Sequence, residues 1–183
     1  MTTIGIIGVG MIANIHADAA KAVGTTVIAV YDSVNERASS FAEKHNCDVC
    51  GTVEELLKRT DVEGVVVAVP NDMHAPLAIQ SLQASKHVLL EKPMAMSLAQ
   101  CDEIIKARDA SGKVLQMGFV CRYSPAAMKA KEIIESGKIG EIHHVQATLL
   151  RQRGIPGIGG WFTTKERSGG GSWITFSRIK DNA

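Results

Sequence analysis

The sequence predicts an α/β fold built on a doubly wound parallel sheet, because strand-like and helix-like segments alternate from Thr3 to Gly118. One apolar run, at residues 65–69, shows no alternation with polar residues, which is typical of a parallel strand covered on both faces. The predicted strands span residues 3–7, 27–31, 48–50, 64–69, 87–90 and 114–118. Ligands of such sheets bind beyond the carboxyl ends of the strands, so the residues that follow each strand are the candidates for a functional site.

Helices are predicted between these strands, near residues 11–23, 34–45, 53–58, 74–85 and 98–110. Three of the helix starts carry the S/T-x-x-E/Q pattern of a capping box. These starts pair Ser33 with Glu36, Thr52 with Glu55, and Ser97 with Gln100.

The alternation changes after Gly118. Ser124 and Pro125 predict the N-cap and first residue of a helix that stops at Gly137. Residues 142–150 read as a strand of a different sheet, residues 153–160 as a loop, and residues 168–171 as a second flexible or close-approach segment. We therefore predict one domain at residues 1–120 and an incomplete second domain at residues 121–183.

The composition excludes several functional classes. The chain has 183 residues, 45% of them hydrophobic and 21% charged, which is enough to build a core. Its net charge of +1 and its aromatic content of 4% do not favour nucleic acid or an anionic membrane as a partner. There is no apolar run of the ~20 residues that span a bilayer, and no signal peptide opens the sequence. These features predict a cytoplasmic protein.

The four cysteines do not form a recognisable zinc pattern. Cys47 and Cys50 have C-x-x-C spacing, but no second such pair or histidine pair completes a site. A redox pair is expected at a helix N-terminus, whereas these two residues lie on a short predicted strand. We predict reduced, partly buried cysteines and no bound metal, with metal or redox use as the alternative.

A glycine pattern at residues 8–13, G-x-G-x-x-A, follows the first strand and opens the first helix. Gly8 permits a tight turn, Gly10 leaves space for a pyrophosphate, and Ala13 lets helix and strand pack closely. Asp32 ends the second strand, about 20 residues further on, where a carboxylate accepts a hydrogen bond from a ribose 2′-OH. The pattern predicts a dinucleotide cofactor, with a merely structural turn as the alternative.

Polar residues also follow the later strands. Lys92, between Glu91 and Pro93, is placed to hydrogen-bond a substrate hydroxyl and assist proton transfer, or else to form a surface salt bridge. Asn71 is placed either to cap a helix or to contact the cofactor. His74 either approaches the nicotinamide or ribose, or is exposed and uninvolved.

For two further residues, a structural role is a simpler interpretation than a functional one. Arg122 is placed to hold a substrate hydroxyl or carboxylate, or to pair with an acid at the domain junction. His16, on the first helix, is predicted to be a helix-surface or interdomain residue rather than a catalyst.

Taken in order, these motifs resemble the Gfo/Idh/MocA oxidoreductase family, named for glucose–fructose oxidoreductase and inositol dehydrogenase. The resemblance extends from about Thr3 to Gly171. Its landmarks are the glycine pattern, Val69-Pro70-Asn71 with His74, Glu91-Lys92-Pro93, Gly118-Phe119 with Arg122 and Pro125, residues 137–142, and Trp161-Phe162 with Ser168-Gly169-Gly170-Gly171.

The resemblance implies an NAD(P)-binding Rossmann domain followed by an α/β domain with an open, mostly antiparallel sheet. It implies hydride transfer between nicotinamide and a hydroxyl-bearing carbon of a sugar, polyol or cyclic diol, with Lys92 contacting the reacting hydroxyl. Asp32 favours NAD, because a carboxylate there repels the 2′-phosphate of NADP, while the nearby Arg37 leaves NADP open. The resemblance also implies a homo-oligomer formed through the second sheet, which an incomplete second domain would weaken.

The resemblance assigns roles residue by residue. The predicted catalytic residue is Lys92, and the predicted substrate contacts are Lys92, Arg122 and Tyr123. The predicted cofactor contacts are Gly8, Gly10, Met11, Ile12, Ala13, Asp32, Arg37, Val69, Pro70, Asn71, His74, Glu91, Lys92 and Pro93.

One departure from the family pattern bears on activity. The triple glycine of the family usually leads into a helix with an aspartate and, four residues later, a histidine, and residues 172–183 contain no such pair. We therefore expect cofactor binding with weak or no turnover, and an ending that is foreign, frameshifted or truncated. The alternative is a non-catalytic dinucleotide sensor or regulatory module.

Overall fold

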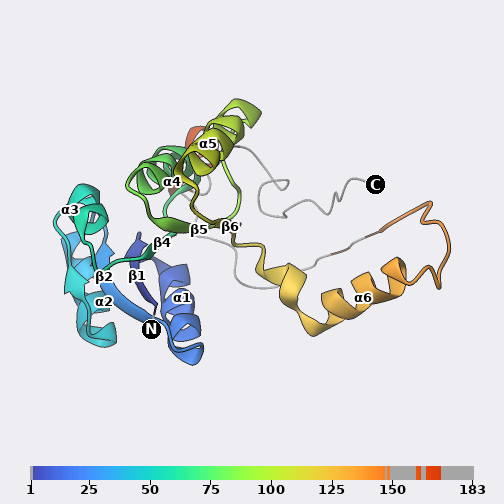
Figure 1. Cartoon of the computed structure of the whole chain (residues 1–183), viewed down its shortest axis with the longest axis horizontal. Helices are drawn as coiled ribbons and strands as arrows, with labels where there is room; N and C mark the ends of the chain where they lie inside the picture. Colours follow the sequence, from blue (N-terminus) through green and yellow to red (C-terminus); the bar gives the residue numbers. More distant parts are fainter. Residues whose placement is uncertain (1, 147, 149–159, 162–163, 170–183) are drawn as a thin grey trace.

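The computed structural model describes residues 2–146, 148, 160–161 and 164–169. Its centre is a six-stranded sheet in the order β3-β2-β1-β4-β5-β6, in which every neighbouring pair is parallel (Figure 1). The predicted doubly wound parallel sheet is therefore confirmed. The strands are β1 (Thr3–Ile7), β2 (Thr26–Tyr31), β3 (Asp48–Val49), β4 (Gly64–Val67), β5 (His87–Leu90) and β6 (Leu115–Met117).

Helices connect the strands in sequence, and the strand order reverses direction between β1 and β4. Such a reversal separates the loops that follow the two strands and creates the crevice in which ligands of open α/β sheets bind. The helices between strands are α1 (Met11–Ala22), α2 (Asn35–His45), α3 (Val53–Lys58), α4 (His74–Gln83) and α5 (Leu98–Ser111), with a 3-10 turn η1 (Asn71–Met73) before α4. After β6 come η2 (Val120–Tyr123), α6 (Pro125–Glu135) and α7 (Lys165–Ser168).

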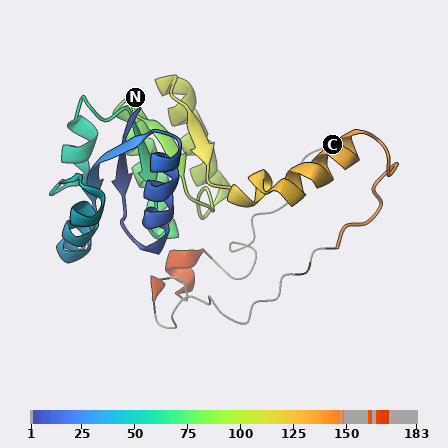
Figure 2. The same ribbon diagram turned by 90° about the horizontal axis from the view of Figure 1, so that it is seen from below.

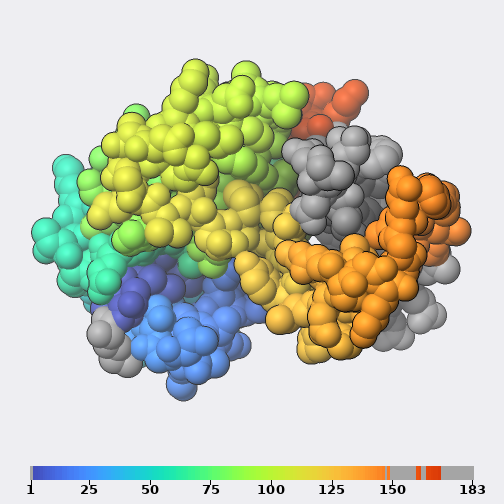
Figure 3. Space-filling view, turned by 45° about the vertical axis from the view of Figure 1, so that its right-hand side comes forward, coloured from blue at the N-terminus to red at the C-terminus, as the bar shows by residue number. Residues whose placement is uncertain are grey.

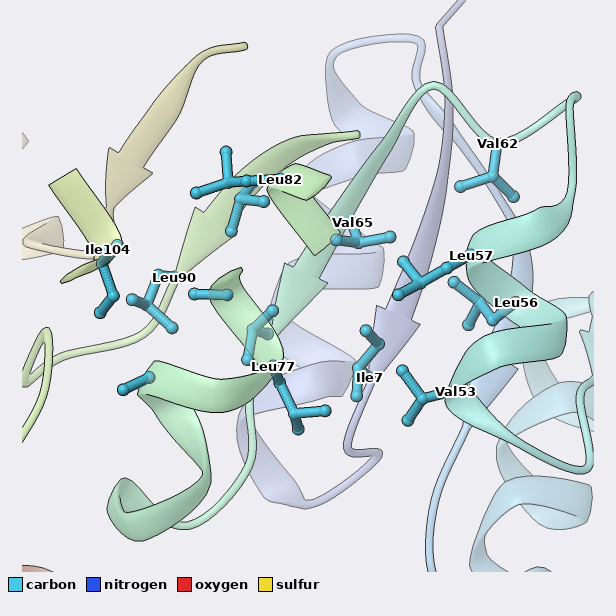
Figure 4. Packing of buried hydrophobic residues seen from close by; sticks show 14 of the residues in the cluster. Ile7, Val53, Leu56, Leu57, Val62, Val65, Leu77, Leu82, Leu90 and Ile104 are labelled. Atoms are coloured by element: carbon cyan, nitrogen blue, oxygen red, sulfur yellow. The ribbon is translucent and has the colours of Figure 1, made fainter. Parts of the chain in front are cut away.

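Both faces of the sheet are covered, because side chains of a strand alternate between its faces. Val66 of β4 packs with Ile6 and Val30 against α1 and α2. Val65 and Val67 point to the other face, where they pack against α3, α4 and α5 (Figure 4). All four residues of β4 are buried, which explains the apolar run without alternation.

Two of the three predicted capping boxes supply the expected N-cap bond. The hydroxyls of Thr52 and Ser97 accept from the backbone N–H groups of Glu55 and Gln100, at 3.1 and 3.3 Å. The prediction for Ser33 is wrong, because α2 has Val34 as its N-cap and no side-chain cap bond. The Asp32 carboxylate instead accepts from the Val34 N–H at 2.8 Å, so the acid that ends β2 also serves the start of α2.

Beyond β6, α6 begins at Pro125 as predicted, with the Ser124 hydroxyl accepting from the Ala127 N–H at 3.3 Å. No residue of α6 is buried, and the helix extends away from the sheet and its covering helices (Figures 2 and 3). The predicted strand at 142–150 is wrong for residues 142–146 and 148, which lie in no strand and have no neighbouring strand to pair with in the described part of the chain. The predicted loop at 153–160 lies outside the described residues except for Gly160.

Candidate functional site

The site is the edge of the sheet where the carboxyl ends of the strands meet. Backbone hydrogen bonds continue the ladder one residue past the strands and fix the first residue of each following loop. Gly8 N–H donates to Tyr31 at 2.8 Å, and Glu91 N–H to Val67 at 3.0 Å. Gly118 N–H donates to Leu90 at 2.8 Å. The loops after β1, β5 and β6 therefore start at one level of the sheet.

The glycine loop is a tight turn with open space in front of the helix that follows it. Gly8 has a φ of +90°, and a Cβ built on it would lie 2.6 Å from the carbonyl oxygen of Ala68, so the position accepts no side chain. A Cβ on Gly10 would meet no atom within 4 Å, so the space in front of the α1 N-terminus is open. Ala13 is fully buried and packs in the cluster of Ile6.

The Asp32 carboxylate ties the glycine loop to the start of α2. One oxygen accepts from the Val9 N–H at 2.9 Å, and the other accepts from the Val34 N–H at 2.8 Å. The Arg37 guanidinium lies 3.0 Å from the second oxygen, and the Asp32 side chain is only 7% exposed while that of Arg37 is 55% exposed. Asp32 and Arg37, both predicted cofactor contacts, therefore lie together at the end of β2.

Asn71 is buried, but it caps no helix. The N-cap of η1 is Pro70, without a side-chain bond, so the capping interpretation is wrong. The Asn71 amide instead donates to the backbone carbonyl of Ser168 at 2.8 Å. Arg167 Nε lies 3.1 Å from Asp72 Oδ2, so two polar contacts hold α7 on η1.

His74 is 1% exposed, so the interpretation as an exposed residue is wrong. Its Nδ1 lies 2.6 Å from the carbonyl oxygen of Pro93, and its Nε2 lies 3.0 Å from that of Val69. The ring therefore links the loop after β4 to the loop after β5. Burial lowers the pKa of His74, and this effect outweighs the two carbonyl bonds and the charge of Glu91, which act to raise the pKa.

This lowered pKa predicts a loss of stability in acid. A histidine whose folded-state pKa lies below its unfolded value stabilises the fold above pH ~6.5, and that contribution is lost as the pH falls through the folded-state pKa. We expect the free energy of unfolding, measured by urea titration from pH 7.5 to 4.5, to decrease less in His74→Gln than in the parent. Equal decreases in the two proteins would contradict the assignment.

Glu91 forms a part-buried pair with His16, a residue that no sequence motif links to it. Its Oε1 lies 2.8 Å from Nε2 of His16, and the two side chains are 12% and 11% exposed. The predicted exposed position of His16 on the helix surface is therefore wrong, while its interdomain role stays a prediction. His16 lies on the same face of α1 as the buried Ala13 and Ala17, and this helical spacing is the signal that was available in the sequence.

The carboxylate of Glu91 stays ionised despite its burial. Burial acts to raise its pKa, but the hydrogen bond and charge of His16, the Lys92 N–H and the Lys92 charge together hold the pKa below its ordinary value. Its Oε2 accepts from the backbone N–H of Lys92 at 3.2 Å. Lys92 itself is half-buried, and the peptide bond between Lys92 and Pro93 is cis.

The other predicted contacts are less enclosed. Met11 is 89% exposed and Ile12 37%, both at the start of α1, whereas Val69 and Pro70 are half-buried. The predicted substrate contacts on η2 are also exposed. The Arg122 guanidinium lies 5.4 Å from the centre of the Phe119 ring, and the hydroxyl of Tyr123 accepts from Gln116 Nε2 at 3.4 Å.

Outside this edge, nothing in the described residues suggests a metal centre or a membrane span. Those residues contain no group of three or more His, Cys, Asp or Glu that could hold a metal ion, and no helix with the length and apolarity to cross a bilayer. All four cysteines are free, and Cys121 is exposed rather than partly buried as predicted. Burial, reinforced by the nearby Asp48, raises the pKa of Cys47 to about 11, so its thiol is protonated at neutral pH.

Residues 2–119 match a family model described as "Oxidoreductase family, NAD-binding Rossmann fold" of the Gfo/Idh/MocA proteins. The chain belongs to the Gfo/Idh/MocA family. Residues 127–176 match the model of a Gfo/Idh/MocA C-terminal domain. Family-like sequence therefore includes residues 172–176 of the ending that we expected to be foreign, frameshifted or truncated.

Two curated relatives and one solved structure illustrate the similarity. The chain is 37% identical over 142 residues to inositol 2-dehydrogenase of Salmonella typhimurium, covering 75% of this chain and 42% of the relative. It is 34% identical over 174 residues to D-glucoside 3-dehydrogenase of Escherichia coli, covering 93% and 49% of the two chains. A crystal structure of an NAD-binding protein from Listeria innocua superposes with a TM-score of 0.83 at 28% identity, covering 94% and 50%. The chain thus spans about half the length of these relatives.

Proposed function

We propose that this chain is the cofactor-binding part of an NAD(P)-dependent dehydrogenase that acts on a hydroxyl-bearing carbon of a sugar or polyol. The observation that carries the proposal is the arrangement of Gly10, Asp32 and Lys92 on one edge of a parallel sheet whose strand order reverses there. The relatives support the substrate class, because those named above act on inositol and on a D-glucoside.

The residues at the glycine loop fit a dinucleotide. The open space in front of Gly10 is where a pyrophosphate would lie, against the N–H groups and positive dipole end of α1. Gly10 has no side chain that could cap those N–H groups in place of a ligand. Asp32 would accept from the ribose 2′-OH, which favours NAD, and Arg37 beside it would be the contact for a 2′-phosphate.

Lys92 is the proposed proton-transfer group. The nicotinamide, when bound, supplies the hydride acceptor or donor. Lys92 would hydrogen-bond the reacting hydroxyl and take up or return its proton, which needs a titratable group within hydrogen-bond reach of that oxygen. Arg122 and Tyr123, on η2 after the neighbouring strand, are the proposed substrate contacts.

We also propose that turnover by this chain is slow. Proton and hydride transfer require all reacting groups to be held in register, and the aspartate–histidine pair usual in the family is not found in residues 172–183. A fast NAD-linked oxidation of polyols by the purified chain would overturn this part of the proposal. Binding of NAD(H) with no hydride transfer to any polyol would instead favour the non-catalytic sensor.

The experiment that tests cofactor binding is calorimetric titration of the parent and of Asp32→Ala with NAD⁺, NADH, NADP⁺ and NADPH. We expect the parent to bind NAD(H) and Asp32→Ala to bind it about tenfold more weakly, because a hydrogen bond to a charged group is lost. The preference for NAD(H) over NADP(H) should fall as well, because the repelling carboxylate is gone.

The matched control is Asp102→Ala, which removes an exposed carboxylate from α5 and should leave all four affinities unchanged. Thermal unfolding of each variant shows whether the loss of the Val9 bond has disturbed the fold. Failure of the folded parent to bind any of the four nucleotides would refute the proposed function.

A further inference from the structure

A part-buried pair of side chains joins the helix of the glycine loop to the strand end that carries Lys92. His16 lies in α1, and Glu91 directly follows β5. Nε2 of His16 and Oε1 of Glu91 are 2.8 Å apart, in a place where both side chains are nearly excluded from solvent. The cofactor-binding proposal alone gives His16 no role.

The Glu91 carboxylate holds two groups at the same time. Oε1 contacts His16, and Oε2 accepts from the backbone N–H of Lys92 at 3.2 Å. An ionised carboxylate can only accept hydrogen bonds, so Nε2 of His16 carries the proton that it donates. The chain of contacts therefore runs from α1 through Glu91 to the backbone of Lys92.

The end of β6 limits where the carboxylate can lie. Gly118 is buried, and a Cβ built on it would lie 3.1 Å from Oε1 of Glu91 and 3.2 Å from Cδ. Any larger residue at Gly118 would press on the pair. Glu91 therefore has a defined place between α1 and β6, and His16 is the side chain that holds it from the α1 side.

We propose that His16 is a positioning residue for Lys92: through Glu91 it fixes the lysine backbone relative to the helix whose N-terminus would hold the cofactor phosphates. The inference rests on the proposed function for the role of Lys92. The connection from His16 through Glu91 to the Lys92 backbone depends only on the contacts described above. Removing His16 takes one of two partners from a buried carboxylate, which would then turn toward solvent and release the Lys92 N–H.

The test compares the parent with His16→Ala, His16→Gln and a control, His45→Ala. Glutamine restores an N–H donor, so it should recover the parent behaviour in part. His45 is a suitable control because it also lies on a helix, is half-buried and makes a side-chain contact through Nε2, 3.1 Å from Asn14. The measurements are hydrogen exchange of the Lys92 backbone amide by NMR, NADH affinity by calorimetry, and kcat and KM with a polyol.

We expect His16→Ala to exchange the Lys92 amide about tenfold faster than the parent, with an unchanged amide at Val9. We expect its kcat to fall about tenfold while KM for NAD⁺ changes less than about twofold, since Gly10 and Asp32, the proposed pyrophosphate and ribose contacts, are untouched. His45→Ala should match the parent in every measurement.

Unchanged exchange at Lys92 in a folded His16→Ala protein would overturn the proposal, as would equal changes in His45→Ala. If His16→Ala does not fold, His16→Leu keeps the bulk, removes the donor and serves the same comparison. If the parent itself transfers no hydride, the proposed function fails in its catalytic part, and amide exchange at Lys92 still decides the role of His16.

Discussion

Replacing Lys92 with methionine is expected to lower the rate of hydride transfer about a thousandfold, because a positioned acid–base group contributes ~10²–10⁴ to the rate. Methionine keeps the length and much of the volume of lysine and removes the titratable amine. The measurement is the absorbance of NADH at 340 nm in a single-turnover experiment with enzyme in excess over the polyol. That format detects transfer even when turnover is slow.

The affinity for NADH should be nearly unchanged in Lys92→Met, because the glycine loop and Asp32 are untouched. A suitable control is Lys106→Met, which removes an exposed lysine of α5 and should keep the parent rate. Transfer at the parent rate by Lys92→Met would remove the lysine from the mechanism. A proportional loss in both variants would point to a general effect of charge instead.

Replacing Gly8 with alanine is expected to reduce the free energy of unfolding by about 3 kcal/mol, since a positive φ and an overpacked Cβ each cost ~1–3 kcal/mol. The φ of Gly8 is +90°, and the new Cβ would lie 2.6 Å from the carbonyl oxygen of Ala68 and 2.8 Å from Cγ1 of Val69. Because the first clash is with backbone, β1 and the loop after β4 must separate. Urea unfolding of the variant and the parent measures the loss.

Gly10→Ala is the matched control for Gly8→Ala. Gly10 has a φ of −71°, and a Cβ there would meet no atom within 4 Å, so stability should be close to that of the parent. The same methyl group would occupy the space proposed for the pyrophosphate, so NADH binding should be weakened. We thus expect Gly8→Ala to lose stability and Gly10→Ala to lose affinity for NADH. An unstable Gly10→Ala protein would contradict this explanation of the loop.

The fold of residues 2–119 could be predicted because the apolar pattern, the turn residues and the helix-capping residues indicate the same strands and helices there. The residues of β4 are apolar on both faces, as helices on both sides of a parallel sheet require, and the glycine loop, Thr52 and Ser97 mark helix starts by their own chemistry. Ser33 was misassigned because α2 starts one residue later than the motif implies, with Val34 as its N-cap and with the N–H of Val34 bonded to Asp32. The sequence alone does not show which of these neighbouring residues starts the helix, because that depends on where the preceding strand ends.

The contacts that organise the site were harder to predict, because they join residues far apart in the chain. His16 and Glu91 come together only once α1 is packed on the sheet, and the spacing of His16 with Ala13 gives its face but not its partner. The same holds for His74, whose two ring nitrogens lie against backbone carbonyls that no side-chain pattern reveals. The bond from Asn71 to Ser168 spans 97 positions, beyond the reach of any motif.

The attachment of α7 to η1 has a thermodynamic consequence. Asn71 and Asp72, which carry the two contacts, lie in the loop after β4, the same loop whose Val69 carbonyl meets His74. Any ligand that changes the order or position of this loop must therefore change the free energy of docking α7. By reciprocity, docking of α7 must change the affinity for that ligand by the same factor. Substitutions in the region of Arg167 can thus change the affinity of a ligand at the sheet edge without contacting that ligand.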